Sequence, residues 1–123
     1  IKQKIRLFFL SKGDNKSLLE LPYFADEFRK NLSEFCYLCT DVYVFGMLPI
    51  ADAKFPGSNA RFDKVNSIIF KETNRHNATF LDWGVRLASR QDCFDLFYRD
   101  GFHPNKSGAK VLAEHLFRVL KIG

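Results

Sequence analysis

The chain has 123 residues, 46% of them hydrophobic, including 14 Phe; this length allows one domain and the composition excludes a disordered tail. Lys and Arg number 19 against 14 Asp and Glu, a net charge of +5, but the basic residues are scattered and predict a mildly basic solvated surface rather than a nucleic-acid-binding tail. No stretch has the roughly 18 consecutive apolar residues of a membrane span.

The first half of the chain predicts a strand, a helix and a second strand. Lys4–Leu10 is a short apolar run that ends at polar residues, which is typical of a buried strand followed by a loop. Apolar side chains then recur at spacings of three and four from Leu21 to Cys39, which predicts an amphipathic helix. Asp41–Gly46 is rich in β-branched and aromatic residues and predicts the second strand.

The second half predicts two further helices and a third strand. Met47–Ser58 contains two prolines and a glycine and is expected to be a loop, after which Asn59 caps a helix that runs to about Arg75. A third strand is expected at Ala78–Asp82. Trp83–Phe102 is expected to be a long loop with a short helical turn. Asn105–Lys121 is expected to be the final helix.

This alternation of strands and helices predicts an α/β domain with a parallel sheet covered on both faces, a three-layer α/β/α arrangement. In such sheets the functional residues gather at the carboxyl ends of the strands. The first strand, Lys4–Leu10, would form an exposed apolar edge if nothing lay beside it, and natural proteins avoid such edges. We therefore expect residues 1–123 to be a single, partial domain.

The three cysteines do not make the even-numbered framework of a disulfide-rich protein. Cys36 and Cys39 have the C-x-x-C spacing that can mark redox or zinc chemistry, but no second C-x-x-C and no pair of histidines completes a zinc site. Both fall on the apolar side of the predicted helix, so we interpret them as a packed pair in the core. The sequence thus predicts neither a metal nor another cofactor.

The segment with the clearest chemical meaning places Asp100 and His103 three residues apart, on a turn that contains Gly101. A carboxylate beside an imidazole orients the ring and stabilises the imidazolium. Alternatively, Asp100 only caps the turn and His103 is an ordinary surface residue. The other histidines are expected to be inert, with His115 on the polar side of the last helix and His76 in a polar connection.

The pattern D-G-F-H-P-N-x-x-G-x-x-x-L-A, which begins at Asp100, resembles the last sequence block of the SGNH/GDSL hydrolases. The resemblance implies that Asp100 and His103 belong to a catalytic triad with a Ser nucleophile. Leu7–Asn15 resembles the strand and loop of the family's G-x-N-D block. On that match Gly13 is the motif glycine and Asn15 an oxyanion-hole side chain, with Lys16 in place of the family's Asp.

Further segments resemble the family in the same order. Val42–Pro49 is similar to the following strand, Asn66 falls where relatives tend to carry an Asn, and Phe80–Trp83 is similar to the last strand. The resemblance thus covers essentially the whole chain and implies a flavodoxin-like fold whose N-terminal strands lie outside it.

The family's G-D-S block, which carries the Ser, is not in the sequence. Gly13–Asn15 is not a degenerate version of it, because only two predicted strands follow, and neither Ser11 nor Ser17 has the required glycine pattern. We therefore expect the chain to begin at the third strand of the family's sheet and to contain no nucleophile.

By resemblance, the expected activity is hydrolysis of a small-molecule, glycan or lipid ester through an acyl-enzyme, with the isolated chain inactive. Esterase-like domains of retroelements are among the relatives. Two alternatives stay open, namely a catalytically dead binding module and a basic α/β domain that contacts nucleic acid.

Overall fold

The computed structural model describes residues 20–51 and 53–121. Three of the sequence-based predictions, the strand Lys4–Leu10 and the site residues Gly13 and Asn15, lie outside the described residues and stay predictions.

The two strands of the described chain are short and parallel. β1 (Tyr43–Phe45) pairs with β2 (Thr79–Leu81), with Val44 opposite Phe80. Both lie inside the strands predicted from the sequence. Because the strands run in parallel, the segments that follow them leave the same edge of the sheet.

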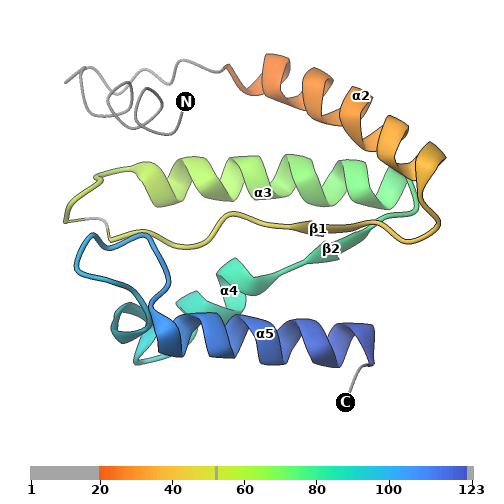
Figure 1. Ribbon diagram of the computed structural model, residues 1–123. Coiled ribbons are helices and arrows are strands. Elements are labelled where there is room, and N and C mark those ends of the chain that lie inside the picture. The colour runs from red at the N-terminus through yellow and green to blue at the C-terminus, as the bar shows by residue number, and fades with distance from the viewer. Residues whose placement is uncertain (1–19, 52, 122–123) are drawn as a thin grey trace.

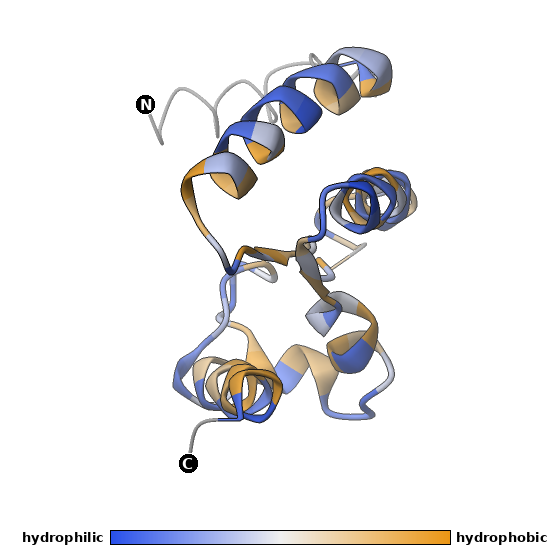
Figure 2. Ribbon diagram, turned by 90° about the vertical axis from the view of Figure 1, so that its right-hand side faces the viewer, coloured by the Kyte–Doolittle hydropathy of each residue, from blue (hydrophilic) through white to orange (hydrophobic). Residues whose placement is uncertain are grey.

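Helices cover both faces of this pair of strands (Figure 1). α2 (Leu21–Leu38) and α3 (Ser58–Arg75) lie on one face, and α2 turns its apolar side towards the strands (Figure 2). On the other face lie α4, a short 3₁₀ helix and α5, which span Trp83–Ala88, Cys93–Leu96 and Lys106–Leu120. The predicted three-layer α/β/α arrangement is confirmed. None of the helices in the described ranges is long and apolar enough to cross a membrane.

The segment Trp83–Phe102 is more ordered than predicted. α4 and the 3₁₀ helix lie within it and contribute Leu87 and Leu96 to a buried cluster that partly buries apolar residues of α5. Phe97, the residue after the 3₁₀ helix, belongs to the same cluster. Cys93 is also part of this cluster. The predicted cysteine pair is wrong, because Cys36 is only half-buried and Cys39 at the end of α2 is exposed; both are free thiols.

The start of α3 also differs from its prediction. The helix begins at Ser58, and its N-cap is Gly57 in the left-handed conformation, with a φ of 77°. Asn59 is therefore inside the helix, and its side chain reaches back across the loop. Its Oδ1 accepts from the N–H of Ile50 at 3.0 Å and its Nδ2 donates to the carbonyl of Ile50 at 2.8 Å. Asn59 closes the loop after β1 instead of capping the helix.

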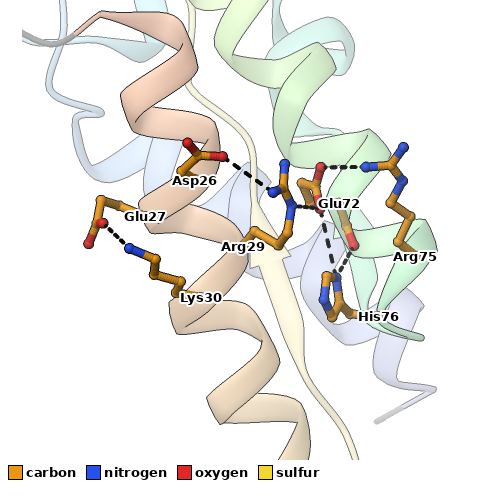
Figure 3. Close-up of polar contacts among 7 residues, drawn as sticks. All are labelled: Asp26, Glu27, Arg29, Lys30, Glu72, Arg75 and His76. Carbon is orange, nitrogen blue, oxygen red and sulfur yellow. Dashed lines mark hydrogen bonds and ion pairs between the residues drawn. The ribbon is translucent and has the colours of Figure 1, made fainter.

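A buried carboxylate joins α2 to α3 (Figure 3). Glu72 is 2% exposed, and its carboxylate accepts from Nε of Arg29 at 3.2 Å and from a guanidinium nitrogen of Arg75 at 3.0 Å. Burial raises the pKa of Glu72, but the hydrogen bond and charge of Arg29 and the charge of Arg75 lower it by more. The net effect is a pKa below the ordinary value, and Glu72 is ionised at neutral pH.

β1 has one edge that faces away from β2, and two aromatic residues of this strand are half-exposed. Tyr43 is 36% and Phe45 is 43% exposed. Beside this edge, α2 and β1 border a hollow of about 360 Å³ with Phe28 and Leu32 in its wall.

Candidate active site

Asp100 and His103 contact each other directly. Nδ1 of His103 lies 2.7 Å from Oδ2 of Asp100. An ionised carboxylate only accepts hydrogen bonds, so this contact places the ring proton on Nδ1. Nε2 is left as the basic nitrogen of the ring, and within the described ranges it has no hydrogen-bond partner. The side chain of His103 is 61% exposed, so Nε2 is open to an incoming group.

The other carboxylate oxygen of Asp100 is held by the backbone of the same turn. Oδ1 accepts from the N–H of His103 at 3.0 Å and from the N–H of Phe102 at 3.1 Å. These two bonds, and after them the imidazole of His103, lower the pKa of Asp100 to about 2. The carboxylate is therefore charged across the physiological pH range.

Backbone hydrogen bonds hold this turn on both sides. Gly101 has a φ of 79°, and its carbonyl accepts from the N–H of Ala51 at 2.9 Å in the loop after β1. Across the turn, the N–H of Tyr98 donates to the carbonyl of His103 at 2.8 Å. A β-carbon added at Gly101 would lie 2.8 Å from that of Ala51. A glycine is therefore required here both for the backbone conformation and for the close approach.

Asn105 connects the turn to α5, which begins at the next residue. Its Oδ1 accepts from the N–H of Gly108 at 3.0 Å, so Asn105 is the N-cap of the helix. Its Nδ2 donates to the carbonyls of Asp95 at 2.7 Å and Phe97 at 3.2 Å. One side chain thus ties the helix start to the preceding segment and fixes where His103 stands.

One aromatic ring lies beside the imidazole, and a second ring packs against the first. The ring of Phe102 lies 3.9 Å, centroid to centroid, from the ring of His103, and Phe55 meets Phe102 edge-on at 5.7 Å. This pair of rings was not predicted from the sequence. Phe102 lies within the motif D-G-F-H, but nothing in the sequence indicates that Phe55 reaches it from the loop before α3.

Asn66 holds the loop that leaves β1. From the middle of α3 its Oδ1 accepts from the N–H of Met47 at 2.6 Å, and its Nδ2 donates to the carbonyl of the same residue at 3.3 Å. Gly84 at the start of α4 passes so close that an added β-carbon would collide with the Met47 carbonyl oxygen. Asn66 therefore fixes the carboxyl edge of the sheet. The structure brings Asp100 and His103 together, whereas Gly13 and Asn15 lie outside the described residues.

No family model and no curated protein matches the chain. Several solved structures match it. A lipase/acylhydrolase from Enterococcus faecalis gives a TM-score of 0.68 at 17% identity, over 79% of this chain and 51% of that one. A catalytic mutant of an acetylxylan esterase from Geobacillus stearothermophilus gives 0.73 at 16% identity, over 97% of this chain and 55% of that one.

The esterase domain of the ORF1 protein from a zebrafish retrotransposon gives a TM-score of 0.64 at 19% identity, over 98% of this chain and 79% of that one. The chain has the fold of these ester hydrolases. It spans about half the length of the two bacterial enzymes. Within the described residues, no group of three or more His, Cys, Asp or Glu side chains is placed to hold a metal ion.

Proposed function

We propose that the chain is part of a serine ester hydrolase of the SGNH type, in which Asp100 and His103 form the acid–base half of the site. The observation that carries the proposal is the 2.7 Å contact between an ionised carboxylate and Nδ1 of an exposed imidazole. The esterase and acylhydrolase folds that the chain resembles support it.

In the proposed mechanism Nε2 of His103 takes the proton of a Ser hydroxyl as that oxygen attacks the ester carbonyl. The resulting imidazolium is stabilised by Asp100, which stays ionised. His103 then gives the proton to the leaving alcohol, and an acyl-enzyme remains. In the second half His103 takes a proton from water, the hydroxide oxygen attacks the acyl carbon, and the proton returns to the Ser as the acid leaves.

The tetrahedral intermediate carries a negative oxygen. We assign its hydrogen-bond donors to the side-chain amide of Asn15 and the backbone N–H of Gly13, the two predicted residues outside the described ranges. One such donor contributes about 3 kcal/mol of transition-state stabilisation.

The proposed nucleophile lies in another stretch of protein, because the 123 residues contain no G-D-S block. Without it the Asp100–His103 pair has no hydroxyl to activate, and covalent catalysis is lost. The proposed substrate is a small-molecule, glycan or lipid ester. The pair of rings, with Phe102 beside the imidazole and Phe55 against Phe102, suits an apolar part of that ester.

The test uses the full-length gene product that contains these residues, with p-nitrophenyl acetate as the ester. We expect turnover that His103→Ala abolishes, whereas the control His76→Gln, at the far end of α3, leaves it unchanged. The 123-residue chain alone is expected to be inactive.

Two results would contradict the proposal. Turnover by the 123-residue chain that disappears in His103→Ala would show that the nucleophile is within it. A folded full-length product that neither turns over the ester nor reacts with a fluorophosphonate would instead identify a non-catalytic binding module.

A further inference from the structure

A second hollow lies between α4 and α5, in the layer on the other face of the strands from α2 and α3. It measures about 280 Å³, and we call it the α4–α5 cavity. Three arginines, an indole and an imidazole stand in its wall: Trp83, Arg86, Arg90, His115 and Arg118. None of them belongs to the turn that holds Asp100 and His103. The cavity is therefore a separate feature of the molecule.

Helical spacing brings these side chains to one place. Trp83 and Arg86 are three residues apart on α4, and His115 and Arg118 are three residues apart on α5, so each pair shares one helix face. The rings of Trp83 and His115 approach to 6.5 Å between centroids. The expectation that His115 lies on the polar side of the last helix is therefore wrong, because its ring packs beside that of Trp83.

The charges around the cavity are unbalanced. Arg90 is paired with Asp92 through two hydrogen bonds of 2.8 Å, and it also feels the charge of Glu114, the acidic residue of the wall. Arg86 and Arg118 have no ion pair or side-chain hydrogen bond with any described residue. Two guanidinium groups in the wall thus have no ion-pair partner among the described residues, and Glu114 is the one carboxylate among the lining residues.

The pKa of the His115 imidazole is also affected by the positive charges of the cavity wall. Burial lowers its pKa, and the positive charges of Arg86 and Arg118 lower it further, against a smaller opposite effect of Asp82. Both guanidinium groups therefore lie close enough to act on this ring.

Two polar atoms in the wall are unsatisfied. Nε1 of Trp83 and Nε2 of His115 are buried and have no hydrogen-bond partner within the described ranges. Buried polar atoms are paired in almost all folded proteins, so an unpaired one calls for an explanation. The indole N–H is a donor only, and the chemistry that complements it is an acceptor.

We propose that the α4–α5 cavity binds a small oxyanion of the phosphate type between Arg86 and Arg118. Planar guanidinium groups donate two parallel hydrogen bonds to phosphate oxygens, which a single point charge does not. The anion supplies the missing counter-charge, and it places an acceptor beside the indole N–H of Trp83. The inference does not depend on the proposed esterase activity, because the two sites share no residue.

Trp83 is the only tryptophan of the chain, so its fluorescence reports on the cavity directly. The chain is titrated with inorganic phosphate at constant ionic strength. We expect a saturable change in emission that Arg86→Ala and Arg118→Ala each weaken at least tenfold. The matched control is Lys110→Ala, which removes the same charge from α5 at an exposed position outside the cavity wall. It should bind as the unaltered chain does.

A change that never saturates, or equal weakening in Lys110→Ala and Arg118→Ala, would overturn the proposal, since either indicates general screening. Far-UV circular dichroism checks that each variant folds. A second measurement needs no variant: NMR titration of His115 should show its pKa rise when phosphate is bound, while an unchanged pKa would contradict the site. Comparing inorganic phosphate with glycerol 3-phosphate then separates a free anion from an esterified one, according to which binds more tightly.

Discussion

His103 receives two different contacts from Asp100. One carboxylate oxygen lies 2.7 Å from Nδ1 of the ring, and the other accepts from the backbone N–H of the same histidine at 3.0 Å. The carboxylate therefore holds both the main chain and the side chain of its partner. In this arrangement Asp100 determines which ring nitrogen carries the proton and where the ring stands.

Removing the charge of Asp100 should lower the catalytic rate as much as removing the orienting carboxylate of a catalytic triad usually does. In the full-length gene product, Asp100→Asn should lower kcat by about 10⁴-fold, because the amide favours the wrong tautomer of His103. Turnover of p-nitrophenyl acetate measures the effect. Asp63→Asn, on the surface of α3, is the matched control. A loss of less than tenfold in Asp100→Asn would show that the pair is not part of the reaction.

The ionisation of Asp100 should be visible in the chain by itself. The pKa of Asp100 is lowered from 3.8 to about 2, so the folded turn favours the ionised carboxylate. The stability that this carboxylate contributes to the fold is present above pH 4 and is lost as the pH falls towards 2. Carboxyl ¹³C NMR should give a midpoint near 2. In His103→Ala the midpoint should rise but stay below 3.8, because the backbone N–H bonds are the larger cause. A midpoint of 3.8 in the unaltered chain would contradict the structure of the turn.

Two glycines with the same backbone conformation offer a matched comparison. Gly101→Ala and Gly57→Ala both place a side chain at a φ near 80°, which costs about 1–2 kcal/mol. The added β-carbon meets Ala51 at Gly101, whereas at Gly57 it meets no non-neighbouring atom of the described residues within 4 Å. Urea unfolding should therefore show a greater loss of stability for Gly101→Ala. Equal losses would mean that the loop carrying Ala51 does not press against the turn.

The buried carboxylate between α2 and α3 should contribute to stability in a pH-dependent way. Glu72→Gln removes the charge that Arg29 and Arg75 contact, and we expect a loss of about 1–3 kcal/mol in the free energy of unfolding at pH 7. Because the folded pKa of Glu72 lies below 4.5, its stabilising effect is present above that pH and disappears as the pH falls below it. The difference in the free energy of unfolding between the unaltered chain and Glu72→Gln should therefore shrink as the pH falls below 4.5. Glu34→Gln, on the exposed side of α2, is the control, and a difference independent of pH would argue against ion pairing.

The amino-acid sequence alone determined α2, α5 and the turn that holds Asp100 and His103. α2 and α5 begin and end within one residue of their predicted bounds, because the spacing of apolar residues and the Asn105 cap are local signals. Asp100 and His103 are also local, since three residues on a tight turn bring their side chains together whatever the rest of the chain does.

Only the tertiary structure decided the contacts between residues far apart in the chain. Asn59 has the sequence pattern of a helix cap, yet it holds Ile50 across a loop, and Glu72 is an ordinary helical glutamate until Arg29 of another helix meets it 43 residues away. The exposure of Cys36 and Cys39 follows from how whole helices pack. The same holds for Nε2 of His115, which is buried without a hydrogen-bond partner among the described residues. The periodicity of a helix shows which residues share a face, but the neighbour that this face meets depends on the packing of the complete layers.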